Sequence, residues 1–241
     1  MDEMTGLRDR VALISGASRG LGRHLALQLA GKGAHLVLLA RNRVQLEEVG
    51  AQVRGLGVNC EVIPCDLARG EEIARVCEGV NAAGSVDILI NNAGFGFYRP
   101  FLDHSPSEHD AIIDVNLRAV IHLTQWLLPP MLKRGSGHIV NIASDVALTP
   151  IGNMAVYAAS KFGVRGFSLS LAREVKGKGV KVSLINPGIV DTAFNDGEEG
   201  SKDGARALRP GQLASLVVQV LEQPGHQMID ELTVHPQMQE Y

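Results

Sequence analysis

Short apolar runs alternate along this chain with longer amphipathic segments. The short runs predict strands at Val11–Ser15, Leu36–Ala40, Glu61–Cys65, Ile88–Ile90, His138–Ala143, Lys181–Asn186 and Ile229–Val234. Most of these runs lack the alternation of apolar and polar residues that is typical of a sheet with one solvated face. We therefore expect helices to cover both faces of the predicted sheet.

The longer segments predict helices that follow the strands in turn. Their expected bounds are Leu21–Gly31, Val44–Leu56, Glu71–Ala83, Pro106–Arg134, Asn153–Lys176 and Gly211–Leu221. Repeated strand–helix units indicate a parallel sheet with right-handed crossovers. The predicted fold class is α/β, a doubly wound, Rossmann-like sheet of about seven strands, with one domain over residues 1–241. Neither a repeat nor a dividing linker interrupts the sequence.

Local signals mark two helix boundaries and one loop. Ser105-Pro106-Ser107-Glu108 offers an N-cap, a proline at the first helical position and a glutamate at the third, so a helix is expected to begin there. Pro129-Pro130 predicts a kink or an end near the C-terminus of that helix. Asp191–Arg209 is rich in Gly, Asp and Glu, and we expect a mobile surface loop beside the functional site.

Composition narrows the classes of function. The chain has 241 residues, 45% of them hydrophobic, and a formal net charge of −3, so it has material for a large core and lacks the basic character of a general nucleic-acid binder. Neither a signal peptide nor a membrane-spanning segment is apparent. Three cysteines without a CxxC pair predict reduced thiols in a cytoplasmic protein. The His and Cys residues lack the spacing of a metal site, so no metal is expected.

The candidate chemistry centres on Tyr157, Lys161 and Ser144. Tyr157 and Lys161 are four residues apart in a predicted helix, so they share one face. A phenol with a pKa of about 10 transfers protons poorly at neutral pH, and a neighbouring ammonium group lowers that pKa by stabilising the phenolate. Ser144 supplies a hydroxyl that could hold a substrate oxygen beside the phenol. These side chains suit proton transfer on an alcohol or carbonyl oxygen; taken singly, each also fits a solvated pair or a cap.

A glycine-rich turn joins the first predicted strand to the first helix. Ser15–Gly22 places glycines in a Gly-x₃-Gly-x-Gly spacing, which permits a tight turn, close approach to a pyrophosphate and exposure of helix N–H groups to that anion. The alternative is a strand–helix turn without a ligand. The position of the turn, after the first strand of a βαβ unit, favours a dinucleotide.

The end of the second predicted strand distinguishes NADP(H) from NAD(H). NAD-binding folds usually carry an acid there, which accepts a hydrogen bond from the ribose 2′-hydroxyl. This chain has Arg41 and Arg43 instead, and Arg41 with Arg19 could clamp a 2′-phosphate. A solvated helix start is the alternative, although cations are disfavoured at a helix N-terminus. We predict NADP(H).

With these residues in view, the chain resembles the short-chain dehydrogenase/reductase family over nearly its whole length. Its cofactor turn is similar to Gly16–Gly22, its adenine-binding acid to Asp66 and its NNAG motif to Asn91–Gly94. Asn186-Pro187-Gly188 with Thr192 resembles the segment that holds the nicotinamide carboxamide. Together with the two arginines, the expected cofactor contacts are Gly16, Ser18, Arg19, Gly20, Leu21, Gly22, Arg41, Asp66, Leu67, Asn92, Ala93, Gly94, Tyr157, Lys161, Pro187, Gly188, Val190 and Thr192.

The resemblance also implies a catalytic tetrad of Asn116, Ser144, Tyr157 and Lys161. A hydride would pass between the nicotinamide and the substrate carbon while Tyr157 gives or takes the proton on the substrate oxygen. Lys161 would lower the Tyr157 pKa and bind the nicotinamide ribose. Ser144 would orient the carbonyl and stabilise charge on its oxygen, and Asn116 would hold a water that links Lys161 to solvent.

Two features depart from the family pattern. Asp145 follows Ser144 where many relatives carry a small neutral residue; a surface charge, a group that repels anionic substrates and an anchor for a cationic group are all open. The C-terminal Ile229–Pro236 lacks the VDGG-like sequence that usually follows the last strand in members that reduce acyl-carrier substrates. Lys133, Arg134, Lys176 and Lys178 could dock an acidic carrier protein, although charges that favour the helix dipole explain them as well.

The expected substrate is a small, moderately apolar molecule with a carbonyl or secondary alcohol. Candidates for the pocket wall are Phe95, Phe97, Tyr98, Val146, Ile151, Met154 and Phe194. The predicted function is an NADP(H)-dependent carbonyl reductase or alcohol dehydrogenase, without nucleic-acid or membrane partners. A 3-oxoacyl-thioester reductase acting on an acyl-carrier protein or CoA, and a non-catalytic dinucleotide sensor, are the alternatives. By resemblance, a homodimer or homotetramer is expected.

Overall fold

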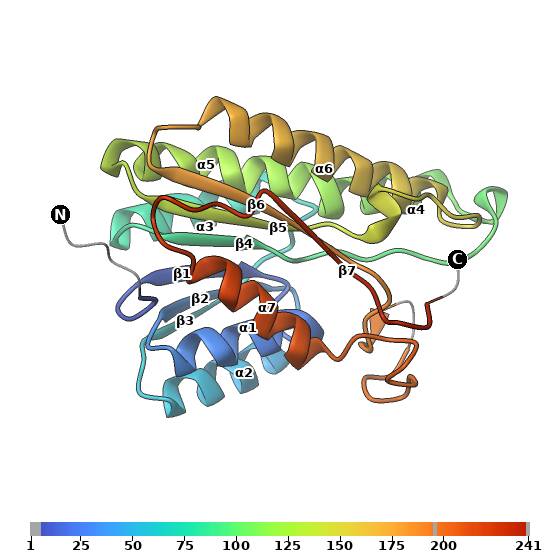
Figure 1. Ribbon diagram of the computed structural model, residues 1–241, viewed down its shortest axis with the longest axis horizontal. Helices are drawn as coiled ribbons and strands as arrows, with labels where there is room; N and C mark the ends of the chain where they lie inside the picture. The colour runs from blue at the N-terminus through green and yellow to red at the C-terminus, as the bar shows by residue number, and fades with distance from the viewer. Residues whose placement is uncertain (1–5, 195–196, 240–241) are drawn as a thin grey trace.

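All seven strands belong to one parallel sheet in a computed structural model, which describes residues 6–194 and 197–239. The sheet has the order β3-β2-β1-β4-β5-β6-β7 (Figure 1). Its strands are β1 (Val11–Ser15), β2 (His35–Ala40), β3 (Cys60–Pro64), β4 (Ile88–Asn91), β5 (Gly137–Ile142), β6 (Val180–Pro187) and β7 (Glu231–Val234). Every prediction of a strand is confirmed to within about two residues.

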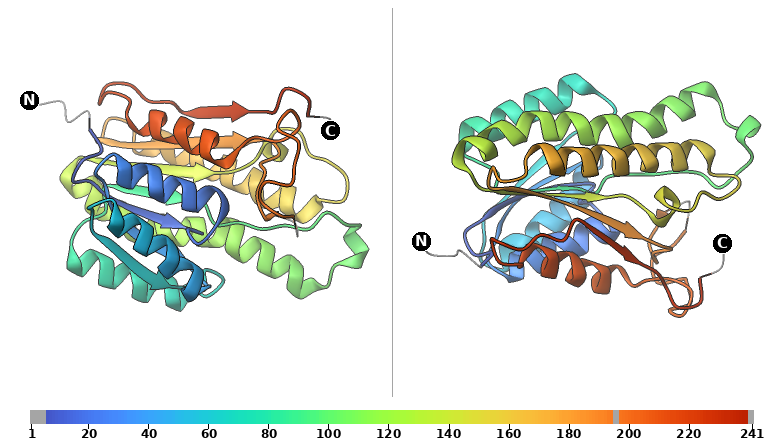
Figure 2. Two further views of the ribbon diagram at one scale, coloured as in Figure 1. Left: turned by 90° about the horizontal axis from the view of Figure 1, so that it is seen from below. Right: turned by 45° about the horizontal axis from the view of Figure 1, so that its top comes forward.

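Helices cover both faces, as the apolar runs predict. Their bounds are α1 (Gly20–Gly31), α2 (Arg43–Gly55), α3 (Gly70–Ala83), α4 (Pro106–Ile113), α5 (Ala119–Arg134), α6 (Ala155–Glu174) and α7 (Pro210–Leu221). Figure 1 shows α1, α2 and α7 below the sheet and α3, α5 and α6 above it, and Figure 2 shows each layer from its own side. This is the doubly wound α/β sheet that the sequence predicts.

Strand β2 shows why the apolar runs are continuous. Leu36 and Leu38 belong to a core cluster shared with α1, α2 and α7, whereas Val37 and Leu39 belong to a second cluster shared with α3 and α5. Successive side chains of a strand point to opposite faces, so both sets of positions are buried. Burial of both faces, and not of one, excludes the alternating pattern of an exposed sheet.

The long segment Pro106–Arg134 is interrupted once. Its start is confirmed, because Ser105 and Glu108 form a reciprocal capping box. A π-helical turn, η2 (Asp114–Arg118), then separates α4 from α5, which the sequence did not predict. An end at Pro129-Pro130 is wrong, since α5 continues to Arg134 and ends at Gly135 in a left-handed conformation (φ 65°), and the alternative, a kink, stays a prediction.

A neighbouring helix compensates for the second proline. Pro130 has no N–H to donate to the carbonyl of Trp126, one helical turn earlier. The side-chain amide of Asn81, in α3, donates to that carbonyl instead at 3.1 Å. The helix therefore passes both prolines without leaving this carbonyl unpaired.

His138 lies within β5 and is buried, with 7% of its surface exposed. Its Nε2 is 2.9 Å from the hydroxyl of Ser183 in β6, and burial, with a smaller contribution from the nearby charge of Lys181, lowers its pKa from 6.5 to about 3. The folded chain therefore holds a neutral imidazole across most of the mildly acidic range.

His138 predicts a specific loss of stability in acid. The unfolded chain takes up this proton as the pH falls below 6.5, whereas the folded chain does so only near pH 3, so stability falls with pH between these values. The slope contributed by one such group is about 1.4 kcal/mol per pH unit. His138→Gln should remove that contribution in urea unfolding between pH 6 and 4. Equal slopes in wild type and His138→Gln would contradict the assignment.

Candidate active site

The sequence-predicted residues gather at the carboxyl ends of β1, β4, β5 and β6. The strand order reverses between β1 and β4, and ligands of open parallel sheets bind beside such a reversal. The glycine turn follows β1, the Asn-Asn-Ala-Gly segment leaves β4, and Ser144 lies just beyond β5. The fold thus brings segments distant in sequence to one edge of the sheet.

The glycine turn packs too tightly for larger residues. Gly16 and Gly20 have φ of 68° and 52°, a region that L side chains rarely adopt. A Cβ on Gly22 would lie 2.2 Å from the carbonyl oxygen of Gly16, and one on Gly16 would lie 2.8 Å from Cα of Ala93. Since α1 begins at Gly20 without a side-chain N-cap, its first N–H groups are open to an anion.

The Asn92–Gly94 segment is fastened to the glycine turn. The hydroxyl of Ser15 accepts hydrogen bonds from the backbone N–H of Asn92 (3.0 Å) and of Ala93 (3.1 Å). The Asn92 side chain donates to the carbonyls of Ser15 (2.9 Å) and Gly16 (3.2 Å). Ser15, which sequence reasoning left without a role, therefore links the two loops.

Arg19, Arg41 and Asp66 belong to a part of the predicted cofactor site that is more exposed than the glycines of the turn themselves. Arg19 and Arg41 are exposed, and Arg41 precedes Asn42, whose side chain caps α2 by accepting from the N–H of Gln45. Asp66 accepts from the N–H of Ala68 at 3.1 Å, a turn contact that leaves its second carboxylate oxygen available. Both arginines are therefore accessible to a ligand at the end of β2.

Beyond β6 a second backbone segment meets the glycine turn. Pro187 ends β6, Gly188 follows, and Val190 pairs in a short parallel bridge with Leu208. The methyl group of Thr192 lies 3.2 Å from the place that a Cβ on Gly20 would occupy. All of the predicted loop contacts thus approach the same edge of the sheet.

The segment expected to be a mobile loop, Asp191–Arg209, is anchored at its base. Asp191 is 1% exposed, and its carboxylate pairs with Arg209 and accepts from the backbone N–H groups of Gly200 (3.1 Å) and Lys202 (3.2 Å). A buried carboxylate with these partners ties both ends of the segment together. The expected mobility stays a prediction for the outer part of the loop.

Tyr157 and Lys161 lie one turn apart in α6 and are both buried. The Lys161 ammonium lies 5.7 Å from the centroid of the Tyr157 ring and donates to the carbonyl of Ile142 at 3.0 Å. Two glycines make this arrangement possible. A Cβ on Gly94 would lie 3.3 Å from the Lys161 nitrogen, and one on Gly96 would lie 2.6 Å from Cδ2 of Tyr157.

The pKa values correct one prediction. Lys161 was expected to lower the pKa of Tyr157, but burial dominates and raises it; a hydrogen bond to Ser144 lowers it in part, and the charge of Asp145 raises it further. Burial also lowers the pKa of Lys161 to about 8. The buried ammonium donates to one acceptor among the described residues, so it retains capacity to bind ligand oxygens.

Asn116 sits within the π-helical turn η2 and is 1% exposed. Its side-chain oxygen accepts from the N–H of Phe95 (3.0 Å), and its amide donates to the carbonyl of Phe95 (2.8 Å) and to Ser160 (3.1 Å). The turn thereby holds the loop that follows β4 against α6. A Cβ on Gly94 would be 3.3 Å from both the Asn116 oxygen and the Lys161 nitrogen, so these atoms flank one point.

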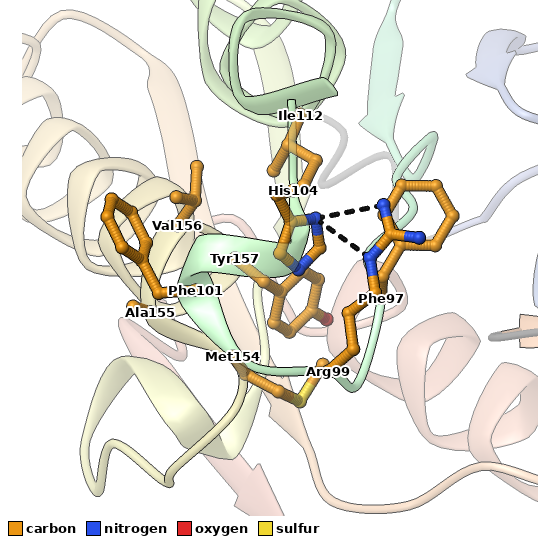
Figure 3. Close-up of a pocket in the computed structure, with 9 residues that line it drawn as sticks. All are labelled: Phe97, Arg99, Phe101, His104, Ile112, Met154, Ala155, Val156 and Tyr157. Atoms are coloured by element: carbon orange, nitrogen blue, oxygen red, sulfur yellow. Dashed lines mark hydrogen bonds between the residues drawn. The ribbon is translucent and has the colours of Figure 1, made fainter. Parts of the chain in front are cut away.

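A pocket opens beside Tyr157, between α6 and the loop that leads to α4. Figure 3 shows its lining, which is Phe97, Arg99, Phe101, His104, Ile112, Met154, Ala155, Val156 and Tyr157. Phe97 and Met154 were predicted wall residues, and Val146, Ile151 and Phe194 pack in one cluster with Tyr157. Tyr98 is 57% exposed and is not among the lining residues.

Arg99 and His104 were missed by the sequence analysis. Arg99 donates to Nδ1 of His104 at 3.3 Å, pairs with Glu108 and lies 4.8 Å over the Phe97 ring (Figure 3). A solitary arginine and histidine in a loop carry no recognisable spacing, so nothing in the sequence marked them.

Residues 6–194 and 197–239 contain no group of His, Cys, Asp and Glu side chains that could hold a metal ion. None of their helices combines the length and hydrophobicity needed to cross a bilayer.

Known proteins share both the sequence pattern and the fold. A family model described as short chain dehydrogenase matches residues 10–202. An uncharacterized oxidoreductase of Staphylococcus epidermidis is 34% identical, with 97% of this chain and 100% of that protein covered. A metagenomic short-chain oxidoreductase crystallised with NADP is 35% identical, with a TM-score of 0.84, and 95% and 98% of the two chains covered. An alcohol dehydrogenase from Thermococcus sibiricus, complexed with 5-hydroxy-NADP, is 28% identical, with a TM-score of 0.91, and 97% and 99% covered.

The contact between Gly96 and Tyr157 yields a prediction that needs no ligand. Gly96→Ala would place a methyl group 2.6 Å from the Tyr157 ring, so it should lower the free energy of unfolding by about 1–3 kcal/mol. Gly152→Ala is the control, since nothing lies within 4 Å of its Cβ. Denaturant unfolding of both variants provides the test; equal stabilities would show that the ring and the loop are not packed this closely.

Proposed function

The chain belongs to the short-chain dehydrogenase family, and from this premise we propose that it is an NADP(H)-dependent oxidoreductase acting on a small carbonyl or secondary alcohol. The observation that carries the proposal is the burial of Tyr157 and Lys161 together, next to Ser144 and at the edge where the glycine turn ends. This arrangement pairs a proton-transfer group with a site suited to a dinucleotide.

Several features of the chain fit an NADP(H) molecule. The glycine turn leaves space where any side chain would intrude, and α1 directs free N–H groups toward it. We propose that Arg19 and Arg41 bind the 2′-phosphate, and that Asp66 and Leu67 meet the adenine. Solved relatives with bound NADP and 5-hydroxy-NADP support this choice. The bound nicotinamide supplies or accepts the hydride.

The remaining proposed cofactor contacts come from three segments. Residues of the glycine turn and of the segment after β4 would line the pyrophosphate and ribose, and residues after β6 would hold the carboxamide. They are Gly16, Ser18, Gly20, Leu21, Gly22, Asn92, Ala93, Gly94, Pro187, Gly188, Val190 and Thr192.

In the proposed mechanism Tyr157 exchanges a proton with the substrate oxygen. It donates during reduction of a carbonyl and accepts during oxidation of an alcohol. The ammonium of Lys161 stabilises the phenolate and donates to the nicotinamide ribose. Ser144 fixes the substrate oxygen beside Tyr157, and Asn116 holds a water between Lys161 and solvent. Each group acts on a proton or a hydrogen bond, which leaves the redox step to the cofactor.

A carrier-protein partner has less support than a small molecule. Arg134, one of the basic residues considered for docking an acidic carrier, donates to the carbonyls of Val86 (2.8 Å) and Pro130 (3.3 Å) and pairs with Asp87. These contacts occupy the guanidinium group of Arg134 at the end of α5, so it is less available to an acidic carrier.

A homo-oligomer remains part of the proposal. The family resemblance points to α5 and α6 as the helices that pair subunits, and Trp126 and Phe162, one on each, are 37% and 42% exposed. Sedimentation equilibrium would distinguish a dimer or tetramer from a monomer. The cytoplasmic location stays a prediction from sequence.

Tyr157→Phe tests the proposed proton donor. The variant should lose about 10²–10⁴-fold in kcat because the substrate oxygen has no partner for proton transfer, while NADPH affinity stays within about twofold. NADPH oxidation over a panel of ketones, diketones and acetoacetyl thioesters measures the first, and fluorescence titration the second. Retained activity would remove Tyr157 from the reaction. Tight NADPH binding by an inactive wild type would instead favour a dinucleotide sensor.

Arg41→Asp tests the cofactor assignment. A carboxylate repels the 2′-phosphate and accepts from a 2′-hydroxyl, so the ratio of kcat/KM with NADPH to that with NADH should fall about tenfold or more. Arg43→Asp introduces the same change of charge two positions later and should have little effect. If the two variants behave alike, Arg41 has no specific contact with the phosphate.

A further inference from the structure

Asp145 is a buried carboxylate in direct contact with the proposed catalytic serine. It begins a short 3₁₀ turn, η3 (Asp145–Ala147), and is 5% exposed, so its interpretation as a surface charge is wrong. Its Oδ1 lies 3.0 Å from the hydroxyl of Ser144, which donates to it. A charge held inside the protein needs partners that offset the loss of water.

The C-terminal segment supplies partners for the other carboxylate oxygen. Nε2 of Gln239 donates to Oδ2 of Asp145 at 2.5 Å, and Nε2 of His235 lies 3.5 Å from the same oxygen. Oε1 of Gln239 also accepts from the N–H of Ile189 at 2.8 Å. Residues more than 90 positions apart in the chain are thus joined at the catalytic serine.

The approach of Gln239 depends on a glycine. A Cβ on Gly188 would lie 2.1 Å from Oε1 of Gln239, so a larger residue there would displace this side chain from its position. The same glycine belongs to the segment after β6 that is proposed to hold the nicotinamide. The C-terminal residues therefore contact both the cofactor segment and the serine loop.

The direction of the Ser144 proton follows from the number of hydrogens available. A serine hydroxyl has one proton to donate, and an ionised carboxylate only accepts. With that proton directed to Asp145, the Ser144 oxygen acts as an acceptor toward other groups. It accepts, for example, from the backbone N–H of Val146 at 3.4 Å. Tyr157 also hydrogen-bonds to Ser144, and this bond lowers the pKa of the phenol because the serine proton turns toward the phenolate; toward the neutral phenol, the Ser144 oxygen accepts.

We infer that Asp145, held in place by Gln239, is a positioning residue that makes Ser144 a hydrogen-bond acceptor in the substrate site. The inference rests on the proposed function. A substrate alcohol can donate its hydroxyl proton to Ser144, whereas a carbonyl oxygen can only accept and must compete with the carboxylate for the Ser144 proton. The site thus favours binding of the alcohol over the corresponding carbonyl.

The charge of Asp145 also acts on Tyr157. Ionisable groups near this carboxylate include Tyr157 on α6 and His235 beyond β7. A neighbouring anion disfavours the phenolate and raises the Tyr157 pKa, so alcohol oxidation should begin at a higher pH than it would without Asp145. His235 is 40% exposed.

The test moves the negative charge from position 145 to position 239 and keeps the hydrogen bonds that join Ser144, residue 145, residue 239 and Ile189. In Asp145→Asn/Gln239→Glu, the new amide carbonyl accepts from Ser144, the new amide N–H₂ donates to the new carboxylate, and that carboxylate accepts from the N–H of Ile189. The measurement is kcat/KM for NADP⁺-dependent oxidation of an alcohol identified in the substrate panel, from pH 5 to 10, together with KM for its ketone. Glu222→Gln, which removes a carboxylate paired with Lys32, is the control.

In the double variant, we expect the rise of kcat/KM on the acidic side of the pH profile to move to a pH about one unit lower. The reason is that the carboxylate at position 239 lies farther from Tyr157 than the one at position 145 does. The ketone KM should fall at least about threefold relative to the alcohol KM, because an amide carbonyl competes less strongly for the Ser144 proton. Glu222→Gln should reproduce the wild-type profile. An unmoved pH profile with an unchanged ratio of KM values would overturn the inference.

Gln239→Met provides a second test should the double variant fold poorly. It removes the donor to Asp145 but leaves the charge, so the alcohol KM should rise at least about threefold without a downward shift of the pH profile. An unchanged KM would show that the C-terminal segment does not position the serine. A wild type that neither reduces a carbonyl nor oxidises an alcohol would refute the proposed function itself, whereas an active wild type with unmoved variants would refute only this inference.

Discussion

Burial of an ammonium group next to a phenol is the constraint on which the active-site end of the sheet depends. Lys161 is 4% exposed and Tyr157 is 8% exposed, and burial disfavours the charged form of each. Such groups persist only where surrounding loops approach closely enough to position them. Gly94 and Gly96 permit that approach from the end of β4, and the carbonyl of Ile142 provides an acceptor from β5.

The same constraint explains why the site joins segments that lie far apart in the sequence. Asn116 holds the loop after β4 against α6 through a turn of π-helix, and Ser15 fixes the start of that loop to the glycine turn. On the other side, Gln239 connects the C-terminus with the serine loop and with the segment after β6. The proposed substrate and cofactor sites share these supports, so we expect a change in one segment to affect the others.

The sequence predicted the fold well because its strongest signals are local. Continuous apolar runs such as that of β2 require cover on both faces, and the capping residues of α4 lie within four positions of one another. The proline pair was misjudged because the compensating donor, Asn81, comes from another helix. The π-turn at Asn116 was missed because a single inserted residue leaves the apolar pattern of the helix almost unchanged.

In the candidate site, too, local sequence signals were recognised whereas contacts between distant segments were not. Motifs with fixed spacing, such as the glycine turn and the Tyr157–Lys161 pair, were recognised, and the fold brings them to one edge of the sheet. Contacts that depend on tertiary structure were not. Burial of Asp145 requires a partner about 90 residues away, and the raised pKa of Tyr157 results from enclosure by loops whose packing no local pattern reveals.

The most direct measurement of the central claim is a crystal structure of the protein with NADP⁺ and a bound substrate alcohol. The account predicts that the hydroxyl of Tyr157 lies within hydrogen-bonding distance of the substrate oxygen, and that the nicotinamide C4 lies about 3–3.5 Å from the carbon bearing that oxygen. A nicotinamide bound away from Tyr157, or a substrate oxygen paired with other groups only, would contradict it.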